Sequence, residues 1–152
     1  MAEKQFVVFK LETEEYGIDI MNVREIAPYQ EVSKVPNTPP FIEGVINFRG
    51  VVIPIINLKK KFSLNDGEIQ SETRLIIMNL EDKQIGFIVD EASETVRLDD
   101  SEIEPAPELI AGVDRAYILG VGKKEERLII LIDLIRILSE DEKDKIITMD
   151  VM

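Results

Sequence analysis

The chain contains no histidine, no cysteine and no tryptophan among its 152 residues. Without histidine it cannot build a Ser-His-Asp or Cys-His nucleophile pair, and it lacks an imidazole base that titrates near neutral pH. Without cysteine it has no disulfide, no thiolate nucleophile and no cysteine ligand for zinc or an iron–sulfur cluster. The groups that remain for catalysis are carboxylates, lysine, tyrosine, serine and threonine.

Positive charge is also scarce, because 30 acidic residues stand against 18 basic ones and give a formal net charge of −12. A nucleic-acid surface needs clustered lysine and arginine to neutralise phosphates. We therefore expect no nucleic-acid partner. With 45% hydrophobic and 32% charged residues, the composition is that of a folded domain.

Long hydrophobic runs are missing as well. The longest apolar stretch, residues 128–138, is interrupted by Asp133 and Arg136, and it is shorter than the roughly 20 residues of a membrane-spanning helix. The first residues, Met1-Ala2-Glu3-Lys4, lack the basic and apolar regions of a secretion signal. We expect a cytoplasmic protein that does not insert directly into a membrane.

Short β-rich runs separated by turn residues fill most of the chain. They are typical of a small barrel or sandwich, and Pro54 inside one run indicates an edge strand or a bulge. The expected strand pairs are residues 6–11 with 16–20, 44–48 with 51–58, 74–80 with 84–89, and 116–121 with 127–132, the last pair joined by a turn at 122–126.

Helix is expected at two places. Asp133 is placed to cap a short C-terminal helix over residues 134–138, followed by a charged tail. A single helical turn is expected at residues 21–25, capped by Asp19 or Asn22.

The sequence also resembles itself. Residues 7–12 match 76–81 and residues 16–18 match 85–87, each 69 residues apart, while 39–45 match 107–113 at a distance of 68 and 53–58 match 129–134 at a distance of 76. Because the matches keep the same order, they indicate two related halves. Each half is too small for a large core, so we expect the two to pack on each other.

Three charged or glycine-rich segments are most simply explained without a ligand. The segment 120–123 lacks the first glycine and the final serine or threonine of a phosphate-binding loop, and it indicates a glycine-rich hairpin. The carboxylates show no glycosidase or calcium-loop spacing. The basic run Lys59-Lys60-Lys61 is interpreted as a solvated strand end.

Two other features allow a functional interpretation beside a structural one. Arg49, beside Phe48 in a turn, is either an exposed loop residue or a cation directed at a partner carboxylate, since arginine offers a rigid fork. Ile20, Val23 and Ile26 recur at intervals of three. They either face the core or line a groove for a partner helix.

Several segments, taken together, resemble the CheW family of bacterial chemotaxis coupling proteins. The most specific is Gly44-Val45-Ile46-Asn47-Phe48-Arg49-Gly50 followed by Pro54, in which Phe48 stands where the family more often has leucine. The resemblance covers nearly the whole chain through residues 15–20, 23–26, 37–50, 53–58, 86–90 and 105–108.

The resemblance implies a non-enzymatic adaptor that links the regulatory domain of the histidine kinase CheA to the tips of methyl-accepting chemoreceptors in signalling arrays. It implies an all-β fold of two packed five-stranded SH3-like barrels related by internal duplication, with a short C-terminal helix. The single domain would span residues 1–152, with a first half at about 16–70 plus strand exchange, a second half at about 73–138 and a tail at 139–152. No cofactor and no metal are implied.

Carried over by position, the resemblance also implies two binding surfaces. The receptor groove maps to Val7, Ile20, Val23, Ile26 and Ala92, and we expect Glu25 and Arg49 at its rim as an ion pair or as direct polar contacts. Kinase binding maps to the repeated segments around Phe41, Ile42 and Gly44 and around Leu109, Ile110 and Gly112, with the first segment preferred.

A different class of function stays open. A ligand- or peptide-binding double barrel outside chemotaxis would have an enclosed apolar pocket, whereas an adaptor would have shallow exposed grooves. A coupling module detached from a response regulator is a third interpretation, but the remaining residues leave no room for a receiver domain.

Overall fold

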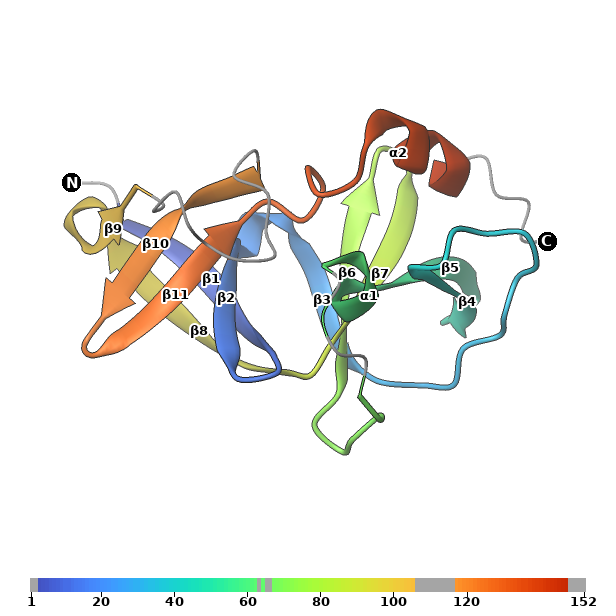
Figure 1. Ribbon diagram of the computed structural model, residues 1–152, viewed down its shortest axis with the longest axis horizontal. Coiled ribbons are helices and arrows are strands. Elements are labelled where there is room, and N and C mark those ends of the chain that lie inside the picture. Colours follow the sequence, from blue (N-terminus) through green and yellow to red (C-terminus); the bar gives the residue numbers. More distant parts are fainter. Residues whose placement is uncertain (1–2, 63, 65–66, 106–116, 148–152) are drawn as a thin grey trace.

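A computed structural model describes residues 3–62, 64, 67–105 and 117–147 of the chain. Within these residues the strands form two sheets that lie side by side along the long axis of the molecule (Figure 1). The first sheet has the order β8-β1-β2-β11-β10-β9 and comprises β1 (Glu3–Leu11), β2 (Glu14–Asp19), β8 (Glu91–Asp99), β9 (Ile103–Glu104), β10 (Ile118–Lys124) and β11 (Arg127–Ile132). The second has the order β3-β6-β7-β5-β4 and comprises β3 (Val23–Pro28), β4 (Ile42–Phe48), β5 (Val51–Asn57), β6 (Arg74–Leu80) and β7 (Lys83–Val89).

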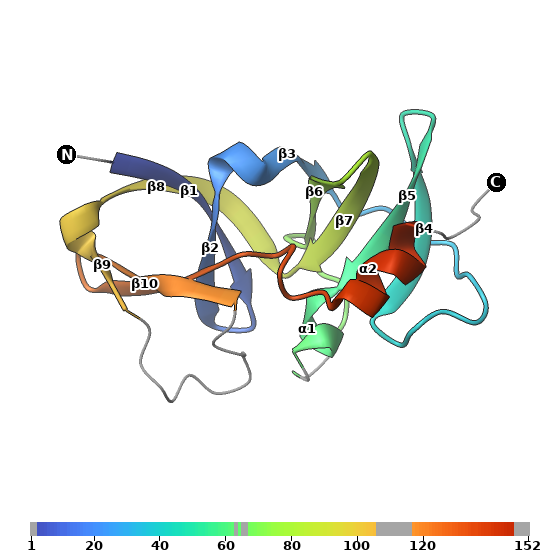
Figure 2. The same cartoon turned by 90° about the horizontal axis from the view of Figure 1, so that it is seen from above.

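Each sheet curls into a small barrel because a short stretch of chain joins its two edges (Figure 2). β8 and β9 lie at opposite edges of the first sheet, barrel 1, but only the turn η2 (Asp100–Glu102) separates them. In the second sheet, barrel 2, Ser33 follows β3 and exchanges backbone hydrogen bonds of 2.9 and 2.8 Å with Val45 of β4. The predicted all-β fold of two SH3-like barrels is confirmed. Barrel 1 has six strands rather than five, because the two-residue β9 pairs separately with β10.

The pairing registers show the internal duplication. Val8 of β1 lies opposite Gly17 of β2, and 69 residues later Ile77 of β6 lies opposite Gly86 of β7. The β4–β5 and β10–β11 pairs correspond in the same way, 76 residues apart. The first two strands of each repeat complete the barrel of the other repeat, since β1 and β2 lie in barrel 1 and β6 and β7 in barrel 2.

One of the sequence matches is wrong. The counterpart of residues 41–45 is residues 117–121 and not 107–113, which lie outside the described residues. The Asn57 N–H donates to the Phe41 carbonyl at 2.8 Å, and the Asp133 N–H donates to the Tyr117 carbonyl at 3.0 Å. The two repeats therefore share a glycine at equivalent positions, Gly44 and Gly120. Each lies at a register shift, with a φ of 146° for Gly44 and 157° for Gly120.

Most of the buried apolar residues lie between the barrels and not inside them. Each barrel has a small interior, built around Ile53, Ile55 and Leu75 in barrel 2 and around Phe6, Ile129 and Leu131 in barrel 1. A larger cluster combines side chains from both barrels, including Phe9 and Phe87. The expectation that two small halves pack on each other is confirmed. A row of rings crosses the contact, with centroid distances of 5.5 Å for Phe9–Tyr16, 6.2 Å for Tyr16–Phe62 and 6.1 Å for Phe62–Tyr117.

The predicted glycine-rich turn is displaced. Gly122, Lys123 and Lys124 belong to β10, and the turn consists of Glu125 and Glu126. Glycine suits position 122 because a Cβ there would lie only 2.5 Å from Cδ1 of the buried Leu98 in the barrel interior.

Pro54 does not mark an edge strand, since β5 lies between β7 and β4. Val45 of β4 lies opposite Pro54, but its backbone N–H and carbonyl both bond to Ser33. The Val45 carbonyl therefore needs no hydrogen bond from residue 54. On the other side, the pairing of β5 with β7 begins only at Ile55. The missing N–H therefore falls where neither neighbour bonds to it.

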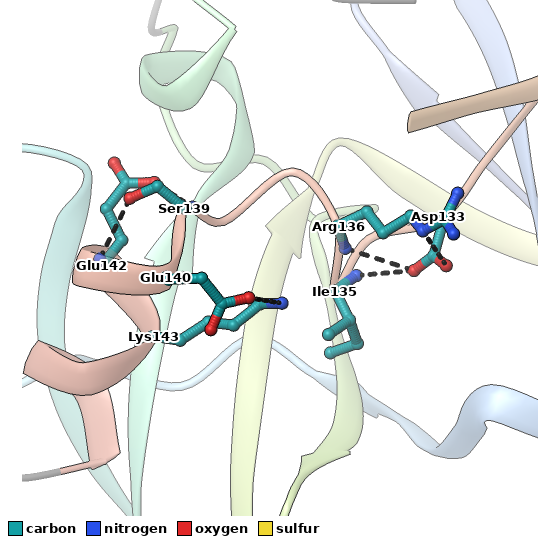
Figure 3. Close-up of polar contacts among 7 residues, drawn as sticks. All are labelled: Asp133, Ile135, Arg136, Ser139, Glu140, Glu142 and Lys143. Atoms are coloured by element: carbon teal, nitrogen blue, oxygen red, sulfur yellow. Dashed lines mark hydrogen bonds and ion pairs between the residues drawn. The ribbon is translucent and has the colours of Figure 1, made fainter. Parts of the chain in front are cut away.

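The C-terminal helix lies later than predicted. Residues 134–138 form turns, and the helix is α2 (Glu140–Ile147). Ser139 and Glu142 cap it reciprocally, since the Glu142 N–H donates to Ser139 Oγ at 3.1 Å and the Ser139 N–H donates to Glu142 Oε1 at 2.8 Å (Figure 3). Asp133 does accept bonds, from the Ile135 and Arg136 amides, but the chain does not continue as a helix.

Two further short helical turns lie among the described residues. The expected turn near residue 21 is η1 (Ile20–Asn22), and Asp19 caps it by accepting a 2.9 Å bond from the Met21 N–H, while Val23 already belongs to β3. The three lysines form α1 (Leu58–Lys61) and not a solvated strand end. Each makes an ion pair, of Lys59 with Asp90 (3.0 Å), Lys60 with Glu43 (2.7 Å) and Lys61 with Glu142 (2.8 Å).

Candidate functional site

The five expected groove residues all belong to or pack against the cluster between the barrels, but they differ in exposure. Val7 and Ala92 are buried, at 1% and 6% exposure. Ile20, Val23 and Ile26 are half-buried at the surface of that cluster. These three side chains therefore pack on the core and stay partly accessible from outside, whereas Val7 and Ala92 are buried members of the same cluster.

An exposed apolar residue that the sequence analysis did not select extends this surface. Met21, in η1, is 85% exposed. It borders a surface hollow of about 240 Å³ that Asn22, Met78, Asn79 and Ile135 also line. The sequence signal was an apolar residue two positions after the capping residue Asp19, where the short turn cannot bury it. We call Ile20, Met21, Val23 and Ile26 the seam surface.

Glu25 and Arg49 form the expected ion pair. Arg49 Nη1 and Nη2 donate to Glu25 Oε1 and Oε2, both at 2.6 Å, and the side chains are 33% exposed for Glu25 and 70% for Arg49. The guanidinium carbon also lies 4.7 Å from the centroid of the Phe48 ring. This is a bidentate, solvent-accessible pair, of a kind that contributes about 0–1 kcal/mol to stability.

The fold brings this pair together across the closure of barrel 2. Glu25 lies on the edge strand β3, directly after a register shift, and Arg49 lies in the turn between β4 and β5. In that turn the Gly50 N–H donates to Asn47 Oδ1 at 2.9 Å, and Arg49 has a positive φ of 54°. The turn thus directs the arginine toward the opposite edge of the sheet.

The expected kinase-binding residues of barrel 2 are part of the core. Phe41 and Ile42 are 8% and 6% exposed, and a Cβ at Gly44 would lie 2.0 Å from the Ser33 carbonyl oxygen. Above them lie polar groups: Lys61 Nζ is 4.9 Å from the Phe41 ring centroid, and Glu43 is paired with Lys60. These side chains therefore shape the surface from beneath, and replacing Ile42 by Asp tests folding before binding. Leu109, Ile110 and Gly112 lie outside the described residues.

A third set of contacts ties the two barrels together. Asp90, between β7 and β8, accepts from Lys59 Nζ of α1 at 3.1 Å and from the Glu12 N–H of the β1–β2 turn at 2.6 Å. Its own N–H donates to the Lys10 carbonyl at 2.9 Å. Sequence analysis missed this role, because an aspartate at a strand end is common and its partners are distant in the chain.

Helix α2 is held against barrel 2 at both ends. Lys61 pairs with Glu142 at its start, and Lys83 Nζ donates to the carbonyls of Ile146 and Ile147 at 3.2 and 3.1 Å. Burial of the Glu142 carboxyl favours the neutral form, but hydrogen bonds from Lys61 and from the Ser139 backbone outweigh burial and hold the pKa of Glu142 below its ordinary value. In the row of aromatic rings, burial of the Tyr16 hydroxyl raises its pKa, and the negative charges of Glu14 and Glu12 raise it further.

The described residues contain no group of three or more acidic, histidine or cysteine side chains arranged to hold a metal ion. Within the same part of the chain, no helix has the length and apolar character needed to cross a membrane. The surface thus carries an apolar seam, a solvent-accessible ion pair beside it, and a polar cover over Phe41 and Ile42.

Comparison with known proteins identifies similar chains over nearly the full length. The family model described as "CheW-like domain" matches residues 5–142. The chain is 40% identical over 139 residues to the chemotaxis protein CheW of Klebsiella aerogenes, covering 91% of this chain and 84% of that protein. It is 39% identical over 138 residues to CheW of Bacillus subtilis, covering 91% and 88%. The crystal structure of the scaffolding protein TtCheW from Thermoanaerobacter tengcongensis superposes with a TM-score of 0.82 at 37% identity, covering 93% of this chain and 92% of that one.

Proposed function

The chain belongs to the CheW-like domain family, and from this premise we propose that it couples the histidine kinase CheA to the cytoplasmic tips of chemoreceptors. As a member of that family it is a chemotaxis scaffolding protein and not an enzyme. The coupling role requires two surfaces that work at the same time, one for each partner. We place the protein in the cytoplasm, associated with the membrane only through its partners.

The seam surface is the proposed receptor-binding site. The observation that carries this assignment is that Ile20, Val23 and Ile26 reach the surface between the barrels beside an exposed arginine–glutamate pair. An apolar strip of this kind fits one face of a partner helix. The hollow beside it, about 240 Å³ in volume, is smaller than the roughly 300–1,000 Å³ of small-molecule pockets. A receptor helix is therefore favoured over the ligand-binding alternative.

The proposed kinase-binding surface is the end of barrel 2 above Phe41 and Ile42. Its accessible groups are the side chain of Lys60, which is 38% exposed, and the carboxylate of Glu43, which forms an ion pair with Lys60. Leu109 and Ile110 remain a proposal for a second contact on barrel 1. Both surfaces would bind reversibly, the receptor surface through apolar groups with a charged rim and the kinase surface through charged groups that cover an apolar core.

We test the receptor surface with the substitution Met21→Glu. The immobilised protein is offered a purified cytoplasmic fragment of a chemoreceptor from the same cell and, separately, the CheA regulatory domain. Because Met21 is 85% exposed, the variant should unfold at the wild-type temperature. Receptor capture should fall by about tenfold or more as a charge enters an apolar contact, while kinase capture is unchanged.

The matched control is Ile69→Glu, which places the same charge at an apolar residue that is 49% exposed in the segment before β6. It should leave receptor capture unchanged. Equal loss in both variants would show that added negative charge, and not the seam, causes the effect. If the wild-type protein captures neither partner, the coupling role itself fails.

A further inference from the structure

The duplication places two glutamates at equivalent positions, one at an open end of each barrel. In barrel 2, Glu25 follows the register shift of β3 and lies opposite Ile77. In barrel 1, Glu94 follows the matching shift of β8 and lies opposite Val8, the counterpart of Ile77. Along the strands, Glu25 is in line with the buried Ala27 and Glu94 is in line with buried residues of barrel 1. Both carboxylates therefore stand at the end of a barrel interior.

The arginines that pair with these glutamates are not equivalent. Arg49 lies in the β4–β5 turn with a φ of 54°, and its counterpart in the β10–β11 turn is Glu125, with a φ of 57°. Barrel 1 carries its arginine two positions later, at Arg127, the first residue of β11. The counterpart of Arg127 is Val51, which is 43% exposed. The arginine has thus moved from a turn into a strand.

This displacement turns the arginine of barrel 1 inward. Arg127 is in line with Ile129 and Leu131, which are buried inside the barrel. Its guanidinium pairs with Glu94 of β8 and, at 3.0 Å, with Glu15 of β2. Since β1 lies between β8 and β2 in the sheet, the side chain crosses the barrel end and joins two strands that are not neighbours. Its side chain is 33% exposed, against 70% for Arg49.

Among the residues that the structure describes, none crosses the end of barrel 2 in this way. The positions that correspond to Arg127, Glu15 and Lys10 of barrel 1 hold the uncharged residues Val51, Gln84 and Asn79. Glu25 is paired with Arg49, which reaches it from outside the barrel end. Releasing Arg49 leaves one carboxylate that water can reach. Releasing Arg127 leaves the carboxylates of Glu15 and Glu94 in one hollow with Lys10 and Glu91, which is three acidic groups against one basic group.

We infer that Arg127 is a specificity-determining residue that locks the end of barrel 1, so that only the Glu25–Arg49 end of barrel 2 can exchange its ion pair for a carboxylate of a partner protein. Of the two equivalent barrel ends, only the end of barrel 2 can then bind a partner carboxylate. A partner helix is thereby directed to barrel 2. The part of this inference that concerns the partner rests on the proposed receptor-coupling function; the locking of Arg127 does not.

The lock is tested on the isolated protein with the matched variants Arg127→Gln and Arg49→Gln. Arg127→Gln should lower the melting temperature by about 3 °C or more, and Arg49→Gln by less than about 1 °C. In NMR spectra of the wild type, the guanidinium N–H groups of Arg127 should rotate slowly and those of Arg49 should be averaged. Equal melting shifts, or equal rotation of the two groups, would overturn the inference.

The directing role is tested by capture of the chemoreceptor cytoplasmic fragment at a temperature where circular dichroism shows both variants to be folded. Arg49→Gln should weaken capture by about fivefold or more, and Arg127→Gln should leave it within about twofold. Equal weakening by a folded Arg127→Gln would contradict the inference. If the wild type does not capture the fragment, the proposed function fails, while the melting and NMR results still decide whether Arg127 is locked.

Discussion

Gly44, near the start of β4, and Gly50, in the turn that follows β4, show how differently single glycines can matter. Gly44 has a φ of 146° and faces the Ser33 carbonyl, so a Cβ there would lie 2.0 Å from that oxygen. Gly50 has a φ of 86° and nothing within 4 Å of such a Cβ. Gly44 permits the close approach of β4 to Ser33 that closes barrel 2. Gly50 is needed only because the turn requires a positive φ at that position.

We therefore predict that Gly44→Ala destabilises the protein by about 3 kcal/mol, because backbone strain adds to a clash that requires β4 and Ser33 to separate. Gly50→Ala should cost about 1 kcal/mol from strain alone. Urea unfolding of the two variants measures the difference. Similar values would mean that the Ser33–Val45 closure contributes little.

Residue by residue, the sequence predicted the candidate site unevenly. The family resemblance anticipated the Glu25–Arg49 pair, whereas the turn by itself indicated only that Arg49 serves no backbone need there. The burial of Ile42 and the contacts of Asp90 could not be anticipated, because both depend on segments far away in the chain. Met21 was passed over for a different reason: an isolated methionine is more often part of a core.

Among the elements, α2 depends most on a single titrating group. The pKa of Glu142 is lower in the folded protein than its ordinary value of 4.5. The stabilisation is therefore fully present above that value and is lost as the pH falls through the lower, folded value. The same carboxylate caps the helix and holds Lys61, so acid should release both contacts together.

The prediction is that Glu142→Gln lowers the melting temperature at neutral pH, and that the difference from the wild type shrinks as the pH falls below 4.5. Melting curves at a series of pH values measure this directly. Glu140→Gln is the control, since Glu140 is 89% exposed. A constant difference at every pH would show that Glu142 acts through packing and not through its charge.

The strands were the easiest elements to predict and the helices the hardest. Nearly continuous β-rich apolar runs between polar turns marked residues 74–80 and 127–132, which the structure has as β6 and β11 with the same bounds. The apolar residues 134–138 suggested a helix, but they serve the core as turns. The helix formed instead at Glu140–Ile147, where the capping pair Ser139 and Glu142 was visible in the sequence but the segment was too polar to indicate burial.

At the scale of the whole molecule, Asp90 joins the barrels at one place. We predict that Asp90→Ala destabilises the protein by about 2 kcal/mol, since it leaves Lys59, which is 11% exposed, without this carboxylate and removes the acceptor of the Glu12 N–H. Hydrogen exchange should show faster exchange of the Glu12 amide than in the wild type. Unchanged exchange there would mean that the Asp90 side chain does not help to hold the barrels together.

The exchange of strands between the repeats has a consequence for the origin of the chain. A protein made of one repeat could close neither barrel, because each barrel takes two strands from the other repeat. Two copies could close both by exchanging those strands about a two-fold axis. The present topology is the one that results when the subunits of such a swapped homodimer are fused into one chain. Separately expressed halves should accordingly fold when they are mixed and not singly.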